Sequence, residues 1–416
     1  MKHRFAVAAV VTASLFATAA HAADWPIAMG TEEGAPDQPL RPLGFLQVVG
    51  EGTSGARVEG LKSKALSKYE GARPTFNTVG DSDASFGLTV RRARIGFRGS
   101  VPSTNKQVTY FLSVEAGTAA INRGSTIRLV DGAITFSMLP GARVRVGQFK
   151  LPTMDETVEA NPISGELINF SNVALGLMLE NKVEKGVYVG GAYAFRDVGI
   201  QVFDTFQRRN VALSYQLMVS NGRFGGTDED NQKDVTGRVM ASWVFSGKAN
   251  DPHRQELSLF AWGQHGTRGY GDRRYERIRE GIGVHLEREP IRLRAELVYG
   301  SGMLVLGPNP PFAGEPIAVA PDGRALGGYA QARVRLFGKL LLGLRYDELH
   351  RQLGQGPALR VLRTLTPAIE WDFTPKAKLM FNYEKRWLGA PDGSEDAQRI
   401  AETIADRVLV QATVTF

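Results

Sequence analysis

Charged and apolar residues alternate along stretches of about ten residues, and this alternation limits the possible folds more than any other feature of the chain. In VRRARIGFRG (90–99), Arg92, Arg94 and Arg98 share one side, and Ala93, Ile95 and Phe97 share the other. Successive side chains of a strand point to opposite faces, so this segment would have a basic and an apolar face. The same sorting recurs in IRLRAELVY (291–299) and YAQARVRLF (329–337). Such repetition is typical of strands that cross an outer membrane.

The alternating segments predict an all-β chain that forms a transmembrane antiparallel β-barrel over residues 43–416. Sixteen strands are expected, at 43–50, 87–98, 107–116, 127–137, 142–149, 197–205, 211–220, 235–246, 255–265, 279–288, 291–300, 328–337, 339–349, 361–372, 376–387 and 406–416. Short links alternate with long ones, as in bacterial outer-membrane barrels. GVYVGGAYAF (186–195) could be a further strand, but an odd total is disfavoured. We therefore place it inside the long third loop, with eighteen strands as the alternative.

The first 22 residues have the features of an export signal. Lys2 and Arg4 precede an apolar run (5–16), and Ala20 and Ala22 form a small-x-small cleavage site. We expect a signal peptide at 1–22 and a periplasmic N-terminal segment at 23–42. No later run reaches the roughly 18 apolar residues that a transmembrane helix needs, which excludes a helical membrane protein. The chain has no cysteine, which excludes disulfides and thiolate metal sites.

The arginines are expected to face the lumen. On the lipid side near the midplane each would cost about 2–4 kcal/mol, whereas the apolar faces suit lipid. Alternation places in the lumen Arg92, Arg94, Arg98, Arg143, Arg145, Arg292, Arg294, Arg333, Arg335 and Arg345, against Glu115, Asp131, Glu296, Asp347 and Glu384. A water-filled bore lined in this way attracts anions. The alternative is that these arginines pair with acids and stiffen the wall; the absence of an acid beside Arg92, Arg94 and Arg98 on their own strand argues against complete pairing.

Several segments, in order along residues 43–245, resemble the phosphate-selective porin O and P family of Gram-negative outer membranes. They are RRARIGFRGSV (91–101), YFLSVEAG (110–117), LVDGAITF (129–136), VRVGQFKLPTMDE (144–156), RDVGIQVFDT (196–205) and LSYQLMVSNG (213–222). The resemblance implies a trimer of sixteen-stranded barrels whose third loop folds inward to narrow each pore. It also implies that Arg91 and Arg92 occupy the family's paired basic position, that Asp131 is its pore-facing acid, and that Lys150 stands where the inward loop begins. The terminal Phe416 resembles the signal that the barrel assembly machinery recognises.

The residues and the resemblance together predict a porin of the Gram-negative outer membrane. It would form a water-filled, anion-preferring channel for the passive diffusion of small anions such as phosphate or pyrophosphate. The predicted pore-lining, anion-binding residues are Arg91, Arg92, Arg94, Arg98, Asp131, Arg143, Arg145, Lys150, Arg292, Arg294, Arg333 and Arg335. The expected partners are small anions, outer-membrane lipid and lipopolysaccharide, the barrel assembly machinery and further copies in a homotrimer. The alternatives are a general diffusion porin and a surface-binding barrel, both without phosphate selectivity.

No catalytic residue, cofactor, metal ion or nucleic-acid partner is expected. Of the histidines beyond the signal segment, His265 and His285 have no obvious serine partner at a shared level, so an enzyme is not predicted. The basic segment 268–279 is interleaved with acids and is expected to be a loop facing the cell surface. GTDEDNQKD (226–234) lacks the ligand spacing and closing glutamate of a calcium loop.

Overall fold

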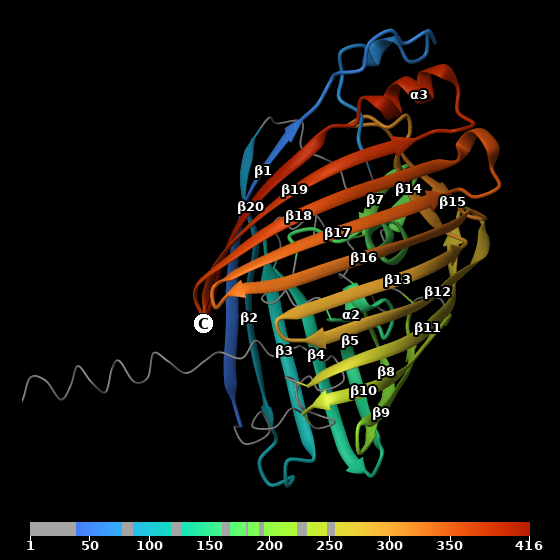
Figure 1. Cartoon of the computed structure of the whole chain (residues 1–416). Helices are drawn as coiled ribbons and strands as arrows, with labels where there is room; N and C mark the ends of the chain where they lie inside the picture. The colour runs from blue at the N-terminus through green and yellow to red at the C-terminus, as the bar shows by residue number, and fades with distance from the viewer. Residues whose placement is uncertain are drawn as a thin grey trace, which may run out of the picture.

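The computed structural model describes residues 39–76, 86–117, 127–159, 167–179, 182–190, 195–222, 231–247 and 254–416. Sixteen strands form one closed barrel (Figure 1), in which each strand pairs antiparallel with the next barrel strand along the chain. The barrel strands are β1 (Arg41–Ser54), β2 (Gly87–Ser100), β3 (Val108–Ala116), β4 (Arg128–Leu139), β5 (Ala142–Lys150), β8 (Arg196–Arg208), β9 (Val211–Ser220), β10 (Asp234–Ser246), β11 (Gln255–Tyr270), β12 (Arg273–Arg288), β13 (Ile291–Ser301), β16 (Arg324–Phe337), β17 (Leu340–Arg351), β18 (Arg360–Thr374), β19 (Ala377–Gly389) and β20 (Asp406–Thr415). Pairing of β1 with β20 closes the wall and leaves no open sheet edge.

The predicted fold class is confirmed, because all sixteen expected segments are barrel strands. Part of the segment at 186–195 forms a small hairpin inside the third loop, β6 (Lys182–Glu184) with β7 (Val187–Gly190). A second hairpin, β14 (Leu304–Pro308) with β15 (Ile317–Ala320), lies between β13 and β16. The eighteen-strand alternative is therefore wrong. The expected signal peptide lies outside the described residues.

Short turns and long loops lie at opposite ends of the barrel. At the short-turn end, two-residue turns lie at 140–141, 209–210, 289–290, 338–339 and 375–376, and the long connections at the other end include 55–86, 151–195, 302–323 and 390–405; the turn 271–272 between β11 and β12 is the short connection at that other end among the described residues. Both ends of the barrel chain, Arg41 and Thr415, lie at the short-turn end. One expectation is wrong: β11 continues to Tyr270 and β12 begins at Arg273, so the segment 268–279 is a hairpin that extends the wall rather than a loop.

The outer face is apolar, as the alternation predicted. Ile291, Leu293 and Leu297 are 43–53% exposed, whereas the side chains of Arg292 and Arg294 on the same strand are only 18% and 11% exposed. Exposed aromatic side chains gather toward the short-turn end and include Phe97, Phe136, Phe206, Trp243, Phe245, Phe337, Trp371, Phe373 and Phe416. Such a belt is typical of side chains at the boundary between lipid tails and headgroups. Within the described ranges no helix is long and apolar enough to cross a membrane.

A β-bulge interrupts the alternation in β2. Gln47 of β1 pairs with Arg92 and Val48 pairs with Val90, so Arg91 is an extra residue on β2. Val90 is 47% exposed on the outer face, while Arg91 is 6% exposed and bonds to a residue inside the barrel. Arg91 and Arg92 therefore both lie on the lumen side, although strict alternation would place them on opposite faces.

The third loop (151–195) folds into the barrel, as expected. Its described parts include α2 (Asp155–Glu159) and the π-helix η3 (Ala174–Met178). Apolar side chains of the loop pack against lumen-facing residues of the wall in a core that includes Met154, Leu177, Met178, Phe203, Phe260, Trp262, Val298 and Tyr329. Burial of this apolar surface favours the docked position of the loop within the bore.

Three long connections pack together beyond the other end of the strands, where Figure 1 shows the first loop close to α3 (Glu395–Glu402). A small core joins residues Val58, Tyr69, Phe312 and Ile400 from these connections. The rings of Tyr69, in η2 (Ser67–Tyr69), and Phe312 stack with centroids 4.1 Å apart. The backbone N–H groups of residues 62 and 63 donate to Asp396 and lower the pKa of its carboxyl. The loop after β17 contains the short helix η4 (Gly356–Ala358).

Candidate functional site

The arginines predicted in the lumen lie there, but most are paired with acids. The ion pairs are Arg94–Glu115 (2.6 Å), Arg143–Asp204 (3.0 Å), Arg292–Glu287 (2.6 Å), Arg294–Glu287 (3.1 Å), Arg333–Glu370 (2.8 Å) and Arg335–Asp372 (3.2 Å). In each pair the acid lies on a different strand from the arginine. The sequence of a single strand such as β2 therefore does not show how many of its arginines are paired. β2 itself carries no acid beside Arg94, as the sequence shows, but Glu115 of the neighbouring strand β3 pairs with it.

Asp131 is fully buried on β4 and binds another basic residue. Its Oδ1 accepts from Arg196 Nε at 2.7 Å, and its Oδ2 accepts from Ser113 Oγ at 2.9 Å. Arg94 Nη1 lies 4.0 Å from the same carboxylate and also binds Glu115. Two guanidiniums and two carboxylates thus form one chain with no net charge, so these four side chains contribute little to anion attraction.

Arg91 and Arg92 differ from this pattern. Arg91 Nη2 donates to Asn169 Oδ1 of the third loop at 2.9 Å, and Asn169 Nδ2 donates to Glu384 Oε1 at 2.8 Å. Arg92 is half-buried and, among the described residues, makes no hydrogen bond or ion pair. Its guanidinium is the clearest positive charge in the lumen that is not already bound to a carboxylate.

Two of the predicted residues stack on aromatic rings. The guanidiniums of Arg143 and Arg145 lie 4.8 and 4.6 Å from the Phe203 ring centroid, and Arg145 lies 5.6 Å from that of Phe149. Arg145 Nε also donates to Thr135 Oγ1. Each cation–π contact is worth about 0.5–2 kcal/mol, so these side chains are held against the wall.

Lys150 is the last residue of β5, and its Nζ donates to the carbonyl of Val158 at 3.0 Å. The lysine therefore stands at the start of the inward loop, where the resemblance placed it, and holds the short helix α2. Arg98 lies near the short-turn end of β2 and is half-buried.

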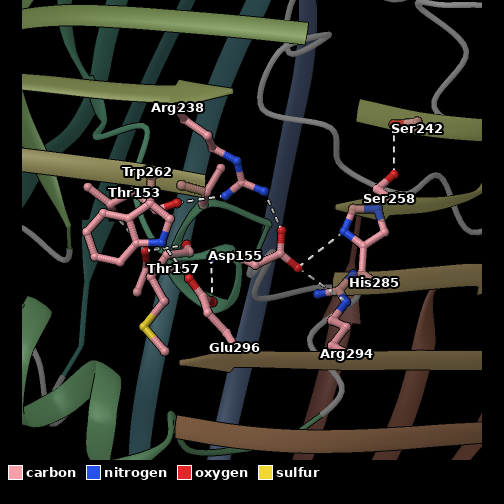
Figure 2. Close-up of polar contacts among 12 residues, drawn as sticks. Thr153, Asp155, Thr157, Arg238, Ser242, Ser258, Trp262, His285, Arg294 and Glu296 are labelled. Atoms are coloured by element: carbon pink, nitrogen blue, oxygen red, sulfur yellow. Dashed lines mark hydrogen bonds and ion pairs between the residues drawn. The ribbon is translucent and has the colours of Figure 1, made fainter. Parts of the chain in front are cut away.

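Sequence reasoning missed the residue that attaches the third loop most closely. Figure 2 shows Asp155 at the centre of three basic side chains, Arg238, His285 and Arg294, a group we call the Asp155 anchor. Asp155 Oδ1 accepts from Arg238 Nη2 at 2.6 Å, and Oδ2 lies 3.6 Å from His285 Nδ1 and 3.8 Å from Arg294 Nε. Burial alone would raise the pKa of Asp155, but these three neighbours hold it well below its usual value. The carboxylate is therefore charged and fixes the loop.

Glu296 of β13 holds the backbone at the same place. Its carboxyl accepts from the Asp155 backbone N–H (3.0 Å), the Tyr329 hydroxyl (3.1 Å) and the Trp262 indole. Arg238 adds a bond to the Thr153 carbonyl at 2.7 Å. The start of α2 is consequently bound to β10 and β13, and Glu296 of β13 is itself held by side chains of β11 and β16.

Further along the loop, other wall arginines bind it. Arg345 of β17 contacts Glu156 at 2.8 Å and Asp347 at 3.1 Å, and Asp347 accepts from Asn172 of the loop at 2.8 Å. Arg277 and Arg279 of β12 both donate to the Leu177 carbonyl, at 3.1 and 2.8 Å. Alternation predicted Arg345 and Asp347 in the lumen, but their partners required knowledge of where the loop docks.

The structure corrects one statement about catalysis. Ser258 is the direct cross-strand partner of His285, so a serine does stand beside this histidine. Ser258 Oγ bonds to Ser242 Oγ at 2.8 Å and Glu256 at 2.7 Å, while His285 Nε2 lies 3.4 Å from Glu256. Ser258 and His285 are at most 1% exposed, and such a covered serine is inaccessible to a substrate. Throughout the described ranges no group of three or more His, Cys, Asp or Glu side chains could hold a metal ion.

Comparison with known proteins identifies the fold. No family model and no curated protein sequence matches the chain. An anion-selective porin from Comamonas acidovorans superposes with a TM-score of 0.56 at 11% identity, covering 91% of this chain and 99% of that one. Salmonella typhi OmpF gives 0.54 at 13% identity, and the outer-membrane channel DcaP of Acinetobacter baumannii gives 0.51 at 12%; each covers 91% of this chain and 97% of the other. The chain therefore shares the sixteen-stranded barrel fold of these proteins.

Proposed function

We propose that the chain is an outer-membrane channel through which small anions, including phosphate and pyrophosphate, diffuse passively. The observation that carries this proposal is the bulge in β2, which turns both Arg91 and Arg92 into the lumen. Arg92 makes no ion pair within the described part of the chain, so its charge is available to a passing ion. Fixed charges in a low-dielectric bore act strongly on permeating ions. The fold shared with an anion-selective porin supports the same proposal.

The attachment of the third loop supports a channel of defined width. The Asp155 anchor and the bonds from Glu296 and Arg345 hold one side of the loop against the wall formed by β10–β13 and β17. A loop bound at so many points narrows the bore by a constant amount. Such a constriction brings permeating ions close to the basic side chains of β2. It therefore increases the preference of the channel for anions.

The remaining assignments are part of the same proposal. Residues 1–22 would direct export to the outer membrane of a Gram-negative cell, where lipid and lipopolysaccharide surround the barrel. Three copies would form a trimer, and the terminal Phe416 would be recognised by the barrel assembly machinery. The chain would have no enzymatic activity and no cofactor.

A second candidate is a surface-binding barrel with a closed lumen. Two observations favour it: the third loop forms an apolar core inside the bore, and the first loop packs against Phe312 and α3 at the long-loop end. Such a barrel would bind a partner with its loops and conduct little current. A general diffusion porin, which conducts without preferring phosphate, is the third possibility.

Planar-bilayer recording of the purified full-length protein distinguishes these functions. The proposal predicts stepwise conductance in KCl, a reversal potential in a salt gradient that indicates chloride preference, and reduction of the chloride current by added phosphate. A surface-binding barrel would give no steps. A general diffusion porin would give steps that phosphate leaves unchanged.

A further inference from the structure

An open groove of about 610 Å³ lies on the outer face of the barrel, beside the turn between β8 and β9. Its apolar part is formed by Phe206, Leu213 and Trp243, which are 53–56% exposed. Its polar end is formed by Arg208 and Arg209 at the tip of the turn. The groove therefore combines an apolar surface with two cationic groups at one end.

The two arginines of the groove are available to a ligand. Both are exposed, and within the described residues neither guanidinium makes a hydrogen bond or ion pair. The nearest acid along the strand, Asp204, is already bound to Arg143. This contrasts with the lumen, where most arginines are paired.

The turn that carries the arginines is fixed by hydrogen bonds. Gln207 Nε2 donates to the carbonyls of Arg209 (3.2 Å) and Gly247 (3.3 Å), and the backbone N–H of Val244 donates to the carbonyl of Asn210 (2.7 Å). The turn is thereby tied to the end of β10, which contributes Trp243 to the groove. A site held in this way loses little conformational entropy on binding.

The height of the groove on the barrel indicates what occupies it. Phe206 and Trp243 belong to the aromatic belt at the short-turn end, so the apolar part faces the ends of lipid tails near the headgroups. Arg208 and Arg209 lie further toward the turn, at the height of the headgroups. Guanidinium groups match phosphate oxygens in geometry and charge.

We propose that this groove binds an anionic phospholipid of the periplasmic leaflet. One acyl chain lies against Phe206, Leu213 and Trp243, and the phosphate binds Arg208 and Arg209. A zwitterionic headgroup brings its own ammonium near the arginines, so it binds less well. This inference needs the membrane location of the proposed function but not its ion selectivity.

Quenching by brominated lipids tests the site in the intact protein. The full chain is reconstituted with a small fraction of phosphatidylglycerol or phosphatidylethanolamine carrying dibrominated acyl chains, and tryptophan emission is recorded. The difference between the natural protein and Trp243→Phe isolates the signal of Trp243. The proposal predicts that the bromophosphatidylglycerol concentration for half-maximal quenching is lower by about tenfold, equivalent to about 1.4 kcal/mol. Equal quenching by the two lipids would overturn the proposal.

A matched pair of double variants tests the arginines. Arg208→Gln with Arg209→Gln removes two positive charges from the groove, and Lys106→Gln with Lys376→Gln removes two exposed charges from other connections at the same end of the barrel. Only the first variant should lose the preference for phosphatidylglycerol. An equal loss in both would indicate general attraction to anionic lipid and refute a site. Conductance steps are measured on the same samples, so absence of a channel is detected separately from absence of lipid binding.

Discussion

Arg91 and Arg92 are consecutive residues of β2, yet both side chains lie on the lumen side, because Arg91 is the extra residue of a bulge opposite Gln47 and Val48. One carries a bond to the third loop and the other makes no hydrogen bond or ion pair within the described residues. Arg91 thus has a structural role, and Arg92 is the main candidate for contact with ions. The anion selectivity proposed for the channel depends on this difference between the two arginines.

Asp155→Asn should loosen the third loop. The substitution keeps the shape of the side chain but leaves Arg238, His285 and Arg294 without their shared carboxylate. Removing one partner of a buried ion pair costs about 3–5 kcal/mol. We expect single-channel current with a larger mean conductance and more open-state noise. Glu276→Gln, at an exposed carboxylate of β12, is the control and should leave both unchanged. Normal conductance and noise in Asp155→Asn would show that the anchor does not fix the loop.

Glu296→Leu should destabilise the docked third loop, because it removes a hydrogen-bond acceptor shared by three uncharged donors. Three donors, from Asp155, Trp262 and Tyr329, would lose their acceptor, at about 1–3 kcal/mol for each buried group left unsatisfied. We expect faster proteolytic cleavage within residues 151–195 and a shift in tryptophan emission. Glu280→Leu removes an exposed carboxylate of the same sheet and serves as the control. Equal cleavage of both variants would contradict the assigned role.

Gly147→Ala should impair folding of the barrel. Gly147 has φ +129°, and a Cβ there would lie 2.1 Å from the carbonyl oxygen of Gly132 on β4. A side chain at this position forces the two strands apart and is also strained in the backbone. The fraction of heat-modifiable barrel in membranes should fall. Gly263→Ala, where nothing lies within 4 Å of the new Cβ, should assemble normally. Normal assembly of both variants would contradict the claim that β4 and β5 are too close at Gly147 for a side chain.

Deletion of Phe416 should reduce assembly more than stability. The residue pairs with Gly44 through two backbone hydrogen bonds, of 3.0 and 3.2 Å, at the closure of the barrel, but its side chain is 64% exposed. An exposed terminal aromatic suits recognition by another protein better than packing. We expect lower amounts of folded barrel in the membrane but an almost unchanged unfolding midpoint for the molecules that fold. Normal membrane levels would refute the proposed signal.

The barrel could be predicted because the alternation of apolar and polar residues can be recognised within the sequence of a single strand. In β13, Ile291, Leu293 and Leu297 alternate with Arg292 and Arg294, and the free energy of charge in lipid decides which face is which. The segment at 186–195 was excluded by the even number of strands alone, and the structure agrees. The extension of β11 to Tyr270 was missed because its outer part lacks apolar residues at alternate positions.

The site was less predictable, because it depends on contacts between distant segments. The pairing of Arg94 with Glu115 crosses to the next strand, and the Asp155 anchor joins the third loop to β10, β12 and β13. The lumen position of Arg91 came only from the resemblance, since alternation predicts the opposite face. A bulge is defined by the register with a partner strand and cannot be read from one strand's sequence.

The reversal potential of Arg92→Glu tests the central claim most directly. Arg92 lies in the lumen and makes no hydrogen bond or ion pair within the described residues, so the substitution changes the local charge by two units with little effect on folding. Arg273→Glu makes the same change at the exposed tip of the β11–β12 hairpin and is the control. In a gradient around 0.1 M KCl, where charges act over about 10 Å, Arg92→Glu should move the reversal potential strongly toward cation preference. Near 1 M, where this distance falls to about 3 Å, the shift should shrink. If Arg92→Glu keeps the natural reversal potential at low salt, or shifts no more than Arg273→Glu, the account of anion selectivity is contradicted.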